Sequence, residues 1–167
     1  MEAIEAILTR RSIRKYTDKK VSAELIEDLL KAAMSAPSAN NSQPWYFVVI
    51  NDRQILDKIP EFHPYSSMLY FASLAITVCA DSKASISYWV QDCSAATENL
   101  LLAAHARGLG AVWLGIYPMK DRVKELGKLL GLPRNIIPLS LISLGYPAAR
   151  KAPEDRYNAA RIHYNRW

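Results

Sequence analysis

The stretch Leu74-Ala75-Ile76-Thr77-Val78-Cys79-Ala80 decides the class of fold, because its run of apolar and β-branched residues is typical of a buried central strand. The next apolar segment, from Ser87 to Arg107, has the length of a long helix, and apolar residues occupy nearly every face of its second half. Such a helix needs burial on all sides, and one small domain rarely surrounds a helix completely. We therefore expect it to contribute to a homodimer core.

Further periodic segments surround this pair. Strands are predicted at residues 45–50, which we expect to be buried, and at 111–115 and 139–145. Helices are predicted at residues 2–9, 22–35, 53–59 and 119–131, the second capped by Ser22. Because strands and helices do not alternate strictly, the pattern favours an α+β fold with a mixed central β-sheet flanked by helices. A length of 167 residues, half of them apolar, suits one domain, residues 1–167.

Composition excludes several classes of protein. No apolar run reaches the roughly 18 residues of a membrane helix, and the first residues do not resemble a signal peptide, so we expect a soluble, cytoplasmic protein without a membrane partner. Two cysteines without C-x-x-C spacing indicate buried free thiols, and three scattered histidines, His63 being the one on a predicted loop, indicate no metal site. His63 itself is expected to be solvated. The net charge of +5 is concentrated at the two ends of the chain, which argues against nucleic acid and for a small anion.

The basic stretch Arg10-Arg11-Ser12-Ile13-Arg14-Lys15-Tyr16 is the first candidate for such an anion site. If it is extended, alternate residues share one face: Arg10, Ser12 and Arg14. Guanidinium groups bind phosphate oxygens through paired charged hydrogen bonds, although a basic cluster can equally be a solvated surface. Arg11 and Lys15 lie on the opposite face, where solvated charge alone would explain them.

A polar loop, Ala36-Pro37-Ser38-Ala39-Asn40-Asn41-Ser42-Gln43-Pro44-Trp45, is the second candidate. Asn and Ser side chains bond their own backbone and Pro fixes φ, so an ordinary structural loop is one interpretation. The other is a binding loop, because the same groups offer neutral donors and acceptors to the edge of a planar heterocycle. Gly115, at the end of a predicted strand, would let the backbone approach something flat.

These motifs resemble, in their order along the chain, those of the FMN-dependent nitroreductase family. The matching segments are Arg10-Arg11-Ser12-Ile13-Arg14, residues 36–45, Gly110-Ala111-Val112-Trp113-Leu114-Gly115 and the arginine-containing tail. The resemblance spans nearly the whole chain and implies a nitroreductase-like, domain-swapped homodimer with two FMN sites, each built from both chains. Residues 148–167 would form a C-terminal arm that packs on the partner subunit.

The resemblance also implies a set of cofactor-binding residues: Arg10, Arg11, Ser12, Arg14, Pro37, Ser38, Ala39, Asn41, Leu114, Gly115 and Arg156. Within this set, Arg10 and Arg156 match phosphate ligands, and Ser12 and Arg14 match the pyrimidine side of the flavin ring. The loop residues match a segment that reaches the flavin from the other subunit. The last two residues of the strand 111–115 match the backbone pair beside the hydride-accepting nitrogen.

Two departures from the family pattern bear on the site. Glu154 stands where the family often has a basic residue, which weakens the case for phosphate binding by the tail. The chain also lacks the helical insertion of larger members, which implies a shallow, permissive substrate pocket.

The activity implied by the resemblance is an FMN-dependent NAD(P)H oxidoreductase acting on small electron-poor acceptors such as nitroaromatics and quinones. Its mechanism would be ping-pong hydride transfer, with no catalytic side chain because the flavin carries the chemistry. Three alternatives stay open: a flavin reductase-like member, a dehalogenase-like member, and a non-catalytic flavin-binding sensor or storage protein.

Overall fold

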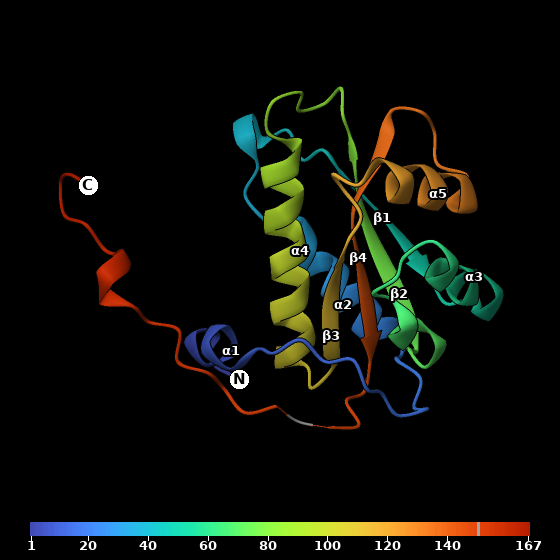
Figure 1. The fold of residues 1–167 in the computed structure, drawn as a ribbon, viewed down its shortest axis with the longest axis horizontal. Helices are drawn as coiled ribbons and strands as arrows, with labels where there is room; N and C mark the ends of the chain where they lie inside the picture. Colours follow the sequence, from blue (N-terminus) through green and yellow to red (C-terminus); the bar gives the residue numbers. More distant parts are fainter. Residues whose placement is uncertain (150) are drawn as a thin grey trace.

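The computed structural model, which describes residues 1–149 and 151–167, is built on a four-stranded sheet with the spatial order β1-β2-β4-β3 (Figure 1). The strands are Trp45–Ile50 (β1), Leu74–Asp81 (β2), Gly110–Gly115 (β3) and Ile136–Gly145 (β4). All three strand pairs are antiparallel, so the α+β class is confirmed and the expected mixed sheet is wrong. The reason is that β4 lies between β2 and β3, which keeps these two strands from pairing with each other.

Strand β2 is buried along almost its whole length because both faces of the sheet are covered (Figure 1). Leu74, Ile76 and Val78 belong to the core cluster that includes the helices Ala23–Met34 (α2) and Trp89–Ala106 (α4). Ala75, between them, belongs to the cluster formed with the helices Arg53–Lys58 (α3) and Lys120–Leu130 (α5). The two-residue period of the strand thus supplies both core layers. Strand β1, at the sheet edge, is only partly buried, contrary to expectation.

Local signals account for the ends of several helices. The Ser22 side chain accepts a hydrogen bond from the backbone N–H of Leu25 and caps α2, as predicted. Asp52 caps α3 in the same way through the N–H of Gln54, and Gly131, in the left-handed conformation, ends α5. Single 3₁₀ turns cover the ranges Ala39–Asn41, Ile59–Glu61, Ser67–Tyr70 and Ala159–Arg161.

The basic stretch lies across two glycines that face each other on neighbouring strands. Gly110 of β3 is paired with Gly145 of β4. A Cβ at Gly110 would come within 2.7 Å of Ile13, and a Cβ at Gly145 would come within 2.9 Å of Tyr16. The segment therefore packs where these strands have no side chains. The three-residue spacing of Ile13 and Tyr16 also shows that the expected two-residue alternation does not continue to Tyr16.

Backbone bonds fix this packing. The N–H of Ile13 donates to the carbonyl of Ala111 at 3.0 Å, and Ser12 forms an isolated parallel bridge with Ala111. The Tyr16 hydroxyl donates to the Ile13 carbonyl at 2.8 Å and accepts from the Ser143 hydroxyl at 3.0 Å, and burial raises the pKa of Tyr16 to about 12. The segment is thus part of the folded body.

Both ends of the chain expose apolar side chains. The helix Ala3–Thr9 (α1) buries only Ala6, while Ile4, Ile7 and Leu8 are exposed. After Pro147 the chain runs past α1 and away from the sheet, and residues 151–167 are exposed, including Tyr164 and Trp167 (Figure 1). Arg150 lies outside the described residues. An arm with this composition suits packing on another protein surface.

The glycine pair gives a direct test of the packing. Gly110→Ala should destabilise the protein by about 1–3 kcal/mol in urea unfolding, because the new methyl group overlaps Ile13. Gly127→Ala is the matched control, since no atom lies within 4 Å of its Cβ position and alanine favours the helix interior by roughly 0.5–1 kcal/mol. Equal unfolding midpoints for wild type and Gly110→Ala would contradict the packing.

Candidate functional site

Three hollows border the basic stretch. The smallest, of about 310 Å³, adjoins Arg11 and Ile13, and the two larger ones hold more of the predicted site residues. We call the first of these two the β3 hollow: it has a volume of about 470 Å³ and is bordered by Arg14, Leu114 and Gly115, with further walls from residues 63–68 and from α5. We call the second the tail hollow: it has a volume of about 540 Å³ and is bordered by Arg10, Arg11 and residues 153–157. The predicted site residues of the basic stretch are thus divided between two places.

The β3 hollow has an open backbone at its centre. Gly115 is the exposed last residue of β3, and no atom lies within 4 Å of the position its Cβ would take. The Gly115 carbonyl accepts two hydrogen bonds, from His63 Nε2 at 3.1 Å and from Arg122 Nη1 at 2.9 Å. These contacts hold the end of β3 in one orientation while leaving its surface open to a flat ligand.

His63 is buried, with 1% of its surface exposed, so the expectation of a solvated side chain is wrong. The backbone N–H of Tyr65 donates to Nδ1 at 3.3 Å, which assigns the proton to Nε2, the atom that faces the Gly115 carbonyl. Burial lowers the pKa of His63, and the nearby charge of Arg122 lowers it further. His63 is therefore a neutral donor that positions the end of β3.

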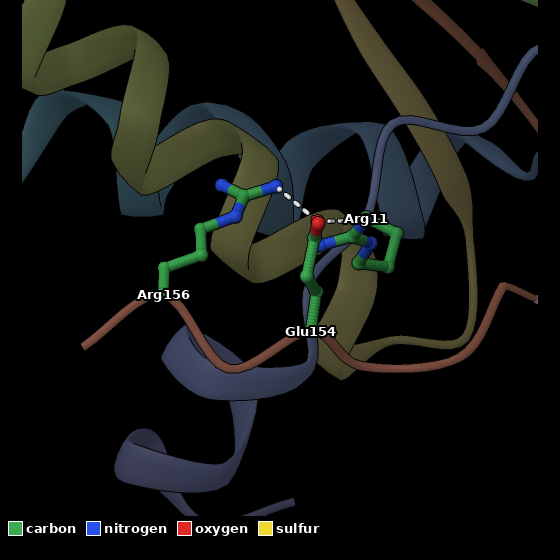
Figure 2. Close-up of polar contacts among 3 residues, drawn as sticks. All are labelled: Arg11, Glu154 and Arg156. Carbon is green, nitrogen blue, oxygen red and sulfur yellow. Dashed lines mark hydrogen bonds and ion pairs between the residues drawn. The ribbon is translucent and has the colours of Figure 1, made fainter. Parts of the chain in front are cut away.

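In the tail hollow, two arginines, Arg11 and Arg156, meet at an acidic residue of the tail, Glu154 (Figure 2). Glu154 Oε2 accepts from Arg11 Nη2 at 2.7 Å and from Arg156 Nη2 at 3.5 Å. Arg10, at the end of α1, forms an ion pair with Glu98 of α4, with Nε and Oε1 separated by 3.2 Å. The two basic ends of the chain do converge, and Arg11 is held in an ion pair, which differs from a purely solvated charge.

The polar loop is held by a buried carboxylate on α4. Asp92, only 5% exposed, accepts from the backbone N–H of Ala39 at 2.9 Å and from the Ser85 hydroxyl at 2.9 Å. Within the loop, Ser38 Oγ accepts from the N–H of Gln43 at 3.0 Å. Asn40 and Asn41 adopt positive φ, a conformation that asparagine tolerates well. The loop is a rigid turn of defined shape.

The structure does not bring the loop to the basic stretch within one chain. The loop contacts the first turn of α4, whereas α1 contacts the other end of this helix, through Thr9 Oγ1 and His105 Nε2 at 2.8 Å (Figure 1). None of the loop residues Pro37, Ser38, Ala39 and Asn41 lines either hollow as described. Ser12, half-buried at its bridge with Ala111, lies in the chain between the arginines of the two hollows.

Three residues that shape the site lie outside the motifs found in the sequence: His63, Asp92 and Arg122. Asp92 carries a visible signal, since it is a carboxylate in a helix that is otherwise largely apolar and buried. His63 and Arg122 carry no comparable signal, because their contacts with Gly115 join segments far apart in the sequence.

Residues 7–66 and 67–146 match the family model of the Nitroreductase family. The chain belongs to this family. It is 54% identical over 172 residues to a protein of Archaeoglobus fulgidus provisionally named NADH dehydrogenase/NAD(P)H nitroreductase, and the match covers 99% of each chain.

Solved structures agree with this assignment. A crystal structure from Parabacteroides distasonis, with the same provisional name, has a TM-score of 0.97 and 45% identity, and covers 99% of this chain and 98% of that one. An FMN-dependent nitroreductase from Clostridium difficile has a TM-score of 0.92 and 29% identity, and covers 98% of this chain and 99% of that one.

Residues 1–149 and 151–167 also bear on metal, membrane and thiol sites. In this part of the chain no group of three potential ligand side chains could hold a metal ion, and none of the helices has the length and apolar character needed to cross a bilayer. Cys79 and Cys93 are buried free thiols, as predicted. Burial raises their pKa values, to about 11 for Cys79 and about 12 for Cys93, which makes them unreactive.

The buried His63 predicts a pH-dependent stability. Its folded pKa lies below the unfolded value of about 6.5, so the unfolded state takes up the proton first and the stability falls as the pH drops below that value. His105, whose pKa burial also lowers, contributes with the same sign. His63→Gln should cost about 1 kcal/mol at pH 7 and reduce the loss of stability between pH 7 and 5, measured by urea unfolding.

Because His105 is present in both proteins, the difference between their pH profiles isolates His63. Parallel profiles for wild type and His63→Gln would show that His63 does not titrate as its contacts require.

Proposed function

We propose that this chain is an FMN-dependent NAD(P)H oxidoreductase that reduces small electron-poor acceptors, such as nitroaromatics and quinones, by a ping-pong mechanism. The observation that carries the proposal is the β3 hollow, where Arg14 and the open end of β3 at Leu114 and Gly115 border one cavity. Membership of the Nitroreductase family supports it. Bound FMN would supply the hydride transfer between NAD(P)H and the acceptor.

The lining of the β3 hollow suits a flat heterocycle that gains negative charge. Tyr65, Met68 and Trp113 provide apolar and aromatic surface, and Arg14 and Arg122 provide positive charge. Among the described residues that line this hollow, none is acidic. Arg14 would thus place a fixed positive charge beside the pyrimidine edge of the ring, where it stabilises electron uptake.

The end of β3 would orient the reacting part of the ring. His63 and Arg122 bond the Gly115 carbonyl, so the backbone of Leu114 and Gly115 is fixed before a ligand arrives. Preorganised backbone groups need no rearrangement during the reaction, which is the main way a protein without a catalytic side chain assists it. No acid or base from the chain is required.

The arginines of the tail hollow would hold the phosphate. Arg10, Arg11 and Arg156 border this hollow, and guanidinium groups suit phosphate oxygens. Ser12, between the arginines of the two hollows in sequence, would contact the pyrimidine side of the flavin ring together with Arg14.

We propose that the complete site needs two copies of the chain in a domain-swapped homodimer. The loop with Pro37, Ser38, Ala39 and Asn41 lies away from both hollows of its own chain, so a partner subunit would supply it. The exposed apolar residues of α1 and of the arm, residues 148–167, would be covered in the same assembly. Residues 1–167 would form one domain in each subunit.

The function is tested by flavin binding and turnover. The purified protein should take up added FMN with the shift of its visible spectrum typical of bound flavin, and NADH or NADPH should bleach that spectrum. Nitroaromatics or quinones should then restore the colour under anaerobic conditions faster than a buffer blank does. A protein that takes up no FMN contradicts the proposal, and turnover only with free flavin or halogenated phenols assigns a different acceptor.

Removal of the arm tests the assembly. A chain that ends at Pro147 keeps the bridge between Tyr16 and Pro147 but lacks the arm and Arg156. It should elute as a monomer in size-exclusion chromatography with light scattering and should bind FMN at least tenfold more weakly, since one charged phosphate contact contributes roughly 1.5–3 kcal/mol. A flavin-bound dimer of the shortened chain would refute the role of the arm.

A further inference from the structure

Each arginine that lines the tail hollow, within the described residues, already has a carboxylate partner from the same chain. Arg10 is paired with Glu98, and both Arg11 and Arg156 donate to Glu154. A phosphate that enters this hollow therefore meets three positive charges that two carboxylates already offset in part.

Glu154 makes the strongest of these contacts. Its oxygen lies 2.7 Å from Arg11 Nη2, a distance at the short end for a charge-assisted hydrogen bond. The Arg11 side chain is 19% exposed, whereas the Glu154 side chain is 59% exposed. The arginine is thus set into the protein surface, and the carboxylate reaches it from the solvent side, as an external anion would.

The geometry resembles that of a bound phosphate oxygen. A single oxygen, Glu154 Oε2, receives hydrogen bonds from two guanidinium groups that come from opposite ends of the chain (Figure 2). A phosphate bound by Arg11 and Arg156 would need this position. It must either displace the carboxylate or lie beside a like charge, and both weaken its binding.

We propose that Glu154 determines cofactor specificity, because its carboxylate competes with the flavin phosphate for Arg11 and Arg156. This inference rests on the proposed flavin-binding function. Its consequence is a small preference for FMN over riboflavin, which shares the ring but lacks the phosphate.

The test compares the two flavins in Glu154→Gln. This substitution keeps the size of the side chain and removes its charge. Titration of the flavin-free full-length protein, followed by quenching of flavin fluorescence, should give a Kd for FMN about three- to fivefold lower than in wild type, as expected for release from a solvent-exposed ion pair. The Kd for riboflavin should change less than about twofold, because riboflavin has no phosphate to compete.

Asp155→Asn is the matched control. Asp155 borders the same hollow and is the next residue in the chain, but its Oδ1 accepts from the backbone N–H of Tyr157 at 2.9 Å. This variant removes one negative charge from the same segment without releasing an arginine, so the ratio of the FMN and riboflavin Kd values should stay within about twofold of wild type.

The outcomes are distinct. Three results would overturn the proposed competition between Glu154 and the phosphate. They are an equal increase in affinity for FMN and riboflavin in Glu154→Gln, an equal increase in FMN affinity in Asp155→Asn, and an unchanged or weaker FMN affinity in Glu154→Gln. Failure of wild type and all variants to bind either flavin would overturn the proposed function itself, and this inference with it.

Discussion

The packing of Ile13 and Tyr16 on a pair of glycines is the constraint on which the rest of the site depends. Gly110 and Gly145 face each other across β3 and β4, and their missing side chains leave the space that Ile13 and Tyr16 fill. A folded core tolerates neither a void nor an overlap at such a place. The basic stretch therefore has one position relative to the sheet, and its arginines have fixed neighbours.

This position explains why the charges of the stretch act in two places. The segment crosses the sheet where β3 begins, so Arg10 and Arg11 remain near α1 and the arm, while Arg14 reaches the cavity at the far end of β3. A ligand with an anionic group and a flat ring matches this separation of charge and open backbone. The long helix α4 contacts both candidate segments. Asp92, near its start, accepts a hydrogen bond from the polar loop, and Glu98 forms an ion pair with Arg10 of the basic stretch.

Much of the architecture was predictable because the signals are local. Apolar runs and alternation predicted the strands, and the capping residue Ser22 predicted the start of α2. The length and apolar character of α4 were also visible in the sequence. The strand order was not predictable. Whether β4 enters between β2 and β3 depends on which edges can bury the most surface together, and no single segment carries that information.

The sequence by itself determined the elements, the candidate motifs and the unusual acidic residue in a basic tail. Only the tertiary structure decided which of these meet: Glu154 and Arg11 are separated by 143 residues, and Asp92 and Ala39 by 53. His63 lies on a loop, where a solvated side chain is expected, but its neighbours in the fold bury it as a donor to Gly115. The physical reason is that periodicity and capping act within a few residues along the chain, whereas burial, pKa shifts and ion pairing depend on neighbours that folding alone brings together.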